Sequence, residues 1–138
     1  MKYVPTFFKP WELVPESVFR RLGNNSLIVM DERILISIDN IRRLLGKSVT
    51  VNNWHEGGPF SQRGFRDDPA TGSTFSQHRF GRALDFDVVG MAADEVRSWI
   101  LNHVKELPFI TRMERDVNWV HIDCAAEDIK GGIILFKG

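Results

Sequence analysis

The sequence predicts an α+β domain in which helices flank a small antiparallel or mixed sheet. The expected elements run in the order helix, strand, long loop, strand, helix and hairpin, an order that favours this class. The 138 residues are close to the usual length of one domain, so we expect residues 1–138 to form a single domain. Hydrophobic residues make up 43% of the chain, which is enough to bury a core.

Two helices are expected before the first strand. Residues 15–22 (PESVFRRL) form a short amphipathic pattern that residues 23–25 (GNN) should end. The stronger signal spans residues 31–45, where Asp31 is a suitable N-cap and Gly46 a suitable stop. The apolar residues of this second helix fall on one stripe: Ile34, Ile38, Ile41 and Leu45.

Two strands enclose a long loop. Residues 48–52 (SVTVN) alternate β-branched and polar side chains, which is typical of a strand. Residues 53–77 contain four Gly and two Pro and show no hydrophobic period, and loops of this length in compact domains are usually functional or disordered. Residues 82–89 (RALDFDVV) again alternate, so that apolar side chains share one face and Asp85 and Asp87 the other.

The last third of the chain predicts a helix and a hairpin. Residues 92–107 are amphipathic and Pro108 should end that helix. Strands at 109–114 and 117–124 would be joined by a tight turn between them, and residues 131–136 (GGIILF) would add a final strand.

Composition excludes several classes of protein. Lys and Arg together number 18, as do Asp and Glu, and this zero net charge argues against a nucleic-acid partner. No apolar run approaches the ~20 residues that span a bilayer, and prolines and charges interrupt the N-terminal segment too early for a signal peptide. We therefore expect a soluble protein that is cytoplasmic at synthesis. Without heptads or an apolar strip, it should be a monomer.

Three residues have side chains that commonly bind metals. His78 lies where the long loop meets the second strand, Asp85 is on the polar face of that strand, and His121 lies in an apolar strand. Two imidazoles and one carboxylate hold zinc in catalytic sites, where the fourth position stays open for water. Each residue also has a simpler explanation, because His121 could be a hydrogen-bonded core histidine and Asp85 an ion-pair partner of neighbouring arginines.

The residues around these candidates favour the metal site. Residues 76–85 (SQHRFGRALD) read S-x-H-x-x-G-x-A-x-D, and residues 119–123 (WVHID) read W-x-H-x-D. This pattern resembles the M15 family of zinc peptidases, which includes D-Ala-D-Ala carboxypeptidases, dipeptidases and peptidoglycan endopeptidases of phages and bacteria. The resemblance covers roughly residues 7–123 and is strongest to the short, phage-associated branch.

The resemblance implies a fold, a cofactor and roles for several residues. The fold would be that of D-Ala-D-Ala peptidases and hedgehog signalling domains, and His78, Asp85 and His121 would bind Zn²⁺. Ser76 and Gly81 would shape the turn that aims His78. The physical reading agrees, because a hydroxyl turn can orient the ring and a glycine allows close backbone approach.

The general base is where the sequence departs from the family pattern. Many members carry an acid three residues before the second histidine or a histidine two before it, but this chain has Asn118 and Trp119 there. The nearest carboxylates are Glu114, the first choice if a hairpin brings it across the ladder, and Asp116, the second. Either could instead be a solvated carboxylate paired with an arginine. Asp123 could orient a ligand or could be a surface acid.

Substrate recognition is assigned to the long loop. Relatives place an arginine there for a substrate carboxylate, which makes Arg66 and Arg63 the candidates, and Ser76 is grouped with them. The expected function is hydrolysis of amide bonds in peptidoglycan peptides, as a carboxypeptidase or an endolysin-type endopeptidase. The alternative is an inactive zinc-binding or phage structural module. The resemblance implies a phage-encoded protein that is released to the cell wall or carried on the virion.

Overall fold

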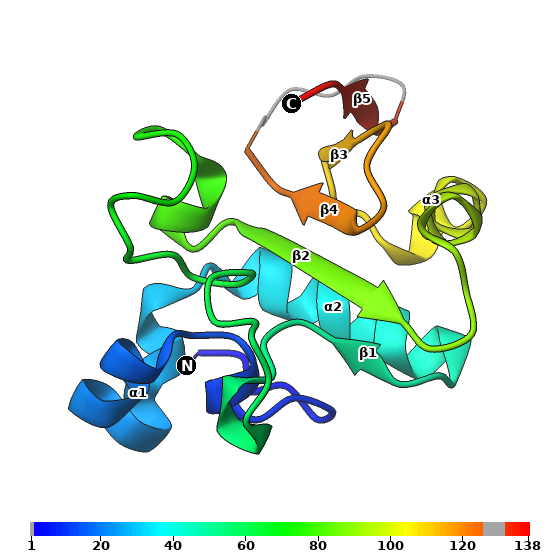
Figure 1. Cartoon of the computed structure of the whole chain (residues 1–138). Helices are drawn as coiled ribbons and strands as arrows, with labels where there is room; N and C mark the ends of the chain where they lie inside the picture. The colour runs from blue at the N-terminus through cyan, green and yellow to red at the C-terminus, as the bar shows by residue number, and fades with distance from the viewer. Residues whose placement is uncertain (1, 126–131) are drawn as a thin grey trace.

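A five-stranded mixed sheet forms the centre of the computed structural model, which describes residues 2–125 and 132–138. The strand order is β1-β2-β4-β3-β5 (Figure 1), and all neighbours are antiparallel except β3 and β5, which are parallel. The strands are β1 (Val49–Thr50), β2 (Ala83–Val88), β4 (Val120–Asp123), β3 (Arg112–Glu114) and β5 (Ile134–Phe136). Together with three α-helices among the described residues, this sheet confirms the predicted α+β class.

The second predicted helix is confirmed at both ends. Helix α2 spans Glu32–Leu45, the Asp31 side chain accepts a hydrogen bond from the Arg33 amide at 2.9 Å, and Gly46 ends the helix in the left-handed conformation. Figure 1 shows α2 lying against the sheet. Its apolar side chains join the buried core together with those of the strands. Helix α1 (Glu16–Leu22) is also present and ends at Gly23 as predicted, and a separate 3-10 helix follows over Gly23–Val29.

Strand β2 has the predicted two faces. Leu84, Phe86 and Val88 belong to the buried core that α2 also joins. Asp85 and Asp87 are on the opposite face, since side chains alternate along a strand. The long loop before β2 is confirmed, and it contains one 3-10 turn, at Trp54–Glu56, before a second one begins at Gln77.

Several boundaries differ from the prediction. Helix α3 (Ala93–Leu101) ends six residues before Leu107, because the chain tightens into a 3-10 turn at Val104–Glu106. The hairpin of β3 and β4 pairs Arg112 with Asp123, and its connection covers residues 115–119, not a two-residue turn.

Strand β5 occupies only the second half of the predicted segment. Gly131, where that segment was expected to begin, lies outside the described residues. Among the residues that are described, no helix combines the length and the apolar character needed to cross a membrane.

Candidate metal centre

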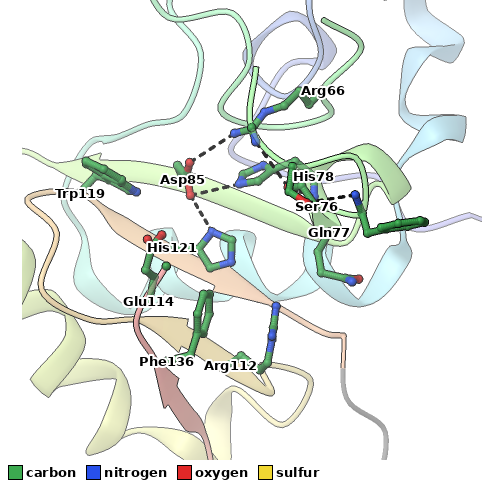
Figure 2. Close-up of a pocket in the computed structure, with 14 residues that line it drawn as sticks. Arg66, Ser76, Gln77, His78, Asp85, Arg112, Glu114, Trp119, His121 and Phe136 are labelled. Atoms are coloured by element: carbon green, nitrogen blue, oxygen red, sulfur yellow. Dashed lines mark hydrogen bonds and ion pairs between the residues drawn. The ribbon is translucent and has the colours of Figure 1, made fainter. Parts of the chain in front are cut away.

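The structure brings together the three predicted ligands His78, Asp85 and His121. One ligand atom from each can be chosen so that all three atoms lie within 4.8 Å of one another. Figure 2 shows both imidazoles pointing toward the Asp85 carboxylate, with His78 from the loop side and the other two from neighbouring strands. Residues 43 positions apart in the sequence therefore form one cluster.

His78 is aimed by its local turn and by a carbonyl from the long loop. It lies in the 3-10 turn Gln77–Phe80, where the Ser76 hydroxyl accepts a hydrogen bond from the His78 amide at 3.3 Å. The buried ring places Nδ1 2.9 Å from the Gly64 carbonyl oxygen. Nδ1–H donates to that carbonyl, and Nε2 faces Asp85 Oδ1 at 3.2 Å.

Two glycines make this arrangement possible. Gly81 ends the turn with φ +69°, and a Cβ there would lie 2.0 Å from the Val29 carbonyl oxygen. A Cβ at Gly64 would lie equally close, 2.0 Å, to the Leu13 carbonyl oxygen. The motif glycine is thus required by backbone packing. The role of Gly64 was missed, because nothing in its local sequence indicates a contact with Leu13.

Asp85 is fixed by the sheet. Its amide donates to the Arg63 carbonyl at 2.7 Å, and its register partner on β4 is His121. Burial opposes ionisation of this carboxyl, but hydrogen bonds from His121 and His78 outweigh that cost and hold its pKa well below the usual range. The carboxylate is therefore ionised at neutral pH, as metal binding requires.

His121 has a carboxylate on each side of its ring. Nδ1 lies 2.8 Å from Asp85 Oδ1 and Nε2 lies 2.8 Å from Asp123 Oδ2. Burial disfavours the imidazolium, but the hydrogen bonds to Asp123 and Asp85 dominate and raise the pKa of His121 to about 9. In the metal-free chain this ring carries a proton that a metal ion would displace.

The donor set fits a transition-metal ion. Two imidazole nitrogens and one carboxylate oxygen converge, and each imidazole is held through its other ring nitrogen, as is usual for metal-binding histidines. The group could therefore hold a metal ion.

The ligands lie in the wall of an open pocket of about 390 Å³. Arg66, Ser76, Glu114, Trp119 and Phe136 also line it. The Arg66 guanidinium lies 3.8 Å from Asp85 Oδ2 and 3.4 Å from the Ser76 hydroxyl, while its Nε donates to the loop at 3.2 Å (Figure 2). The predicted substrate residues Arg66 and Ser76 are therefore both at the site.

The two candidate bases differ in position. Glu114, at the end of β3, lines the pocket beside His121, and no hydrogen bond or ion pair ties its carboxylate to another described residue (Figure 2). Asp116 lies on the hairpin connection with φ +66°, pairs with Arg115 at 2.8 Å, and is absent from the pocket wall. The structure thus brings only Glu114 to the ligands.

Arg63 contacts the site through its backbone and not through its charged guanidinium. Its guanidinium pairs with Asp87 at 2.9 Å and lies over the Phe60 ring, outside the pocket wall. Its carbonyl positions Asp85, as described above. Of the two arginines predicted to bind substrate, Arg66 lines the pocket and Arg63 does not.

Two further features of the site are clear only in the structure. Phe136 from β5 meets the His121 ring edge-on, with ring centroids 5.4 Å apart, and sequence reasoning gave that strand no role. Asp123 is fully buried, so it is not a surface acid.

No protein-family model, curated protein or solved structure matches the chain.

Proposed function

We propose that the chain is a zinc-dependent peptidase that hydrolyses amide bonds in peptidoglycan peptides, with the fold of the M15 peptidases and hedgehog domains. The observation that carries this proposal is the meeting of His78, Asp85 and His121 in the wall of an open pocket. The motif around these residues supports zinc as the metal, because this donor set is that of catalytic zinc sites.

The atom through which each histidine would bind the metal follows from which of its ring nitrogens is engaged by another residue. His78 would bind through Nε2 and His121 through Nδ1, since the opposite ring nitrogens are engaged by Gly64 and Asp123. Asp85 would supply the carboxylate oxygen. A bound zinc ion supplies two things at such a site: it lowers the pKa of a water molecule and polarises the carbonyl to be attacked.

Glu114 has the position and the freedom of a general base. Its carboxylate lies in the pocket wall with no hydrogen bond or ion pair to another described residue, so it can accept a proton from the attacking water. As the C–N bond breaks, the same carboxyl returns that proton to the leaving amine, and water has been added across the amide. Asn118, where relatives carry an acid, is exposed and does not line the pocket.

Arg66 is suited to hold an anionic part of the substrate. Hydrogen bonds to the Gln62 carbonyl and the Ser76 hydroxyl fix its guanidinium in the pocket wall. A planar guanidinium binds carboxylates through two parallel hydrogen bonds, and peptidoglycan stem peptides end in carboxylates.

The test is hydrolysis of purified peptidoglycan before and after metal removal. We expect a chelator to abolish the release of amino groups or of free alanine, and stoichiometric zinc to restore it. Which product appears separates endopeptidase from carboxypeptidase action. Full activity in metal-free protein would refute the proposal.

Three variants assign the roles. His121→Ala should lose both zinc and activity, whereas Glu114→Gln should keep zinc and lose activity by about 10²-fold or more. Asp116→Asn is the matched control, because its carboxylate lies outside the pocket, and it should retain both. Loss of activity in Asp116→Asn with normal activity in Glu114→Gln would reverse the assignment of the base.

A second candidate function is a zinc-binding module without hydrolysis. The observation that favours it is Asn118 at the family's acid position, since an amide cannot take a proton. In that case the unmodified chain would bind zinc and adhere to peptidoglycan, but no amino groups or alanine would be released.

A further inference from the structure

Asp123 joins the candidate metal centre to an ion pair on the neighbouring strand. It lies two residues after His121 on β4, so the two side chains share a face, and its Oδ2 lies 2.8 Å from His121 Nε2. From β3, its register partner Arg112 donates through Nε at 2.9 Å to Oδ1 and through Nη2 at 2.9 Å to Oδ2. Both carboxylate oxygens are therefore held, and the carboxylate is fully buried.

The two histidines have different second partners. His78 Nδ1 faces a neutral carbonyl, that of Gly64, at 2.9 Å. His121 Nε2 faces a charged carboxylate, which draws the ring proton more strongly and makes the opposite nitrogen a better donor to a metal. The contribution of Asp123 is thus electronic as well as geometric.

Phe136 packs against both His121 and Arg112. Its ring stands edge-on to His121 at a centroid distance of 5.4 Å, and the Arg112 guanidinium lies 4.4 Å from its centroid on the face of the ring. Figure 2 shows the Phe136 ring below His121 and beside Arg112. Contact with Phe136 restricts rotation of the His121 ring and shields the ion pair from water.

We propose that Asp123 and Arg112 are positioning residues for the metal centre: Arg112 fixes the Asp123 carboxylate, and Asp123 fixes His121 with Nδ1 toward Asp85 and strengthens it as a ligand. This inference rests on the proposed function only in requiring that the three ligands bind a metal. The competing explanation is an ion pair that merely joins β3 to β4. Such a pair would affect the stability of the fold but not the metal affinity of the folded protein.

The experiment is a competition between the full chain and a chelator for zinc at fixed pH. Asp123→Asn keeps the shape of the side chain and removes its charge, and we expect zinc affinity to fall about 10- to 100-fold. Cobalt(II) replaces zinc as a spectroscopic probe, and its visible absorption bands should shift in the variant, since the donor strength of His121 changes.

The matched control is Asp87→Asn. Asp87 also pairs with an arginine, Arg63 at 2.9 Å, but no hydrogen bond or ion pair among the described residues joins either side chain to the three ligands. Arg63 contacts Asp85 only through its backbone carbonyl, which the substitution leaves in place. Zinc affinity and the cobalt spectrum should be those of the unmodified chain.

Arg112 variants keep the test decisive if Asp123→Asn does not fold. The Arg112 side chain is partly exposed, so Arg112→Met should fold, and we expect an affinity loss of about 10-fold. Arg112→Lys restores one charged hydrogen bond and should recover part of that loss.

The possible failures are distinguishable. Unchanged zinc affinity and cobalt spectra in the folded Asp123 and Arg112 variants, with normal metal binding by the unmodified chain, would overturn this inference and leave the proposed function intact. An unmodified chain that binds no metal would overturn both.

Discussion

Gly81→Ala should both destabilise the protein and weaken its metal site. The residue has φ +69°, a region that costs a non-glycine residue about 1–2 kcal/mol. The new methyl would also lie 2.0 Å from the Val29 carbonyl oxygen and 3.0 Å from Met30 Cα, contacts that force the backbone to move. We therefore expect a loss of about 3 kcal/mol or more in the free energy of unfolding.

The displacement should reach His78. The Gly81 amide donates to the His78 carbonyl at 3.3 Å, and the Gly81 carbonyl accepts from the Asp31 amide at 2.9 Å, so the turn is attached to both the ligand and helix α2. A shift of the turn misdirects the ring, and zinc affinity should fall about 10-fold or more. Urea unfolding of the metal-free protein and a chelator competition measure the two effects.

Gly46→Ala is the control that separates the steric clash of the new methyl from the cost of the positive φ. Gly46 has nearly the same φ, +65°, but a Cβ there meets nothing within 4 Å. It should cost only about 1–2 kcal/mol and leave zinc affinity unchanged. Equal destabilisation by the two substitutions, with normal zinc binding in both, would refute the reasoning.

Three further predictions concern pH, a buried carboxylate and the cysteine. In the metal-free protein the pKa of His121 is about 9, against an ordinary value of 6.5. The stabilisation that the protonated ring contributes to the fold is therefore complete below pH 6.5 and is lost as the pH rises to 9. The stabilisation that added zinc provides should grow over the same interval. Asp39→Ala should cost about 2–4 kcal/mol in urea unfolding, because buried Asp39 accepts the amides of Thr6 and Phe7 at 2.9 Å each. Burial raises the pKa of the Cys124 thiol to about 11, so iodoacetamide at pH 8 should modify this cysteine only in unfolded protein.

Each of these has a contrary result. Stability of the metal-free protein that rises from pH 6.5 to 9 would contradict the assignment for His121. Asp39→Ala with the unfolding midpoint of the unmodified chain would show that its hydrogen bonds add nothing. Rapid alkylation of the native protein would place Cys124 at the surface.

The elements that sequence predicted best are those determined by local interactions. Helix α2 begins at a side-chain cap, Asp31, and ends at a left-handed glycine, Gly46, and both signals lie within a few residues of the helix. The end of α3 was wrong because Leu107 is buried by a separate 3-10 turn, so the apolar pattern continued after the helix had stopped. A pattern of buried residues does not distinguish an α-helix from a 3-10 turn that follows it.

The hairpin connection was wrong for a non-local reason. Buried Arg97 on α3 donates to the carbonyls of Val117 and Trp119 at 2.9 Å each. These bonds hold residues 115–119 as a longer connection, bent over residues 116–119, where the sequence suggested a two-residue turn. A contact between α3 and this segment has no signature in either stretch alone.

The distinction between local and non-local interactions also holds for the site. The meeting of His78, Asp85 and His121 could be predicted because the motifs around them resemble those of a known family, whereas residue types and spacing alone left simpler explanations open. The positions of Arg63 and Asp116 could not, since each depends on which opposite charge lies nearest in the fold, Asp87 for one and Arg115 for the other.

The most direct test of the account is a crystal structure of the zinc-loaded protein with anomalous diffraction data collected at the zinc absorption edge. The account predicts one strong anomalous peak per chain, bonded to His78 Nε2, the Asp85 carboxylate and His121 Nδ1. No peak among these three side chains, or a peak only at other residues, would contradict it.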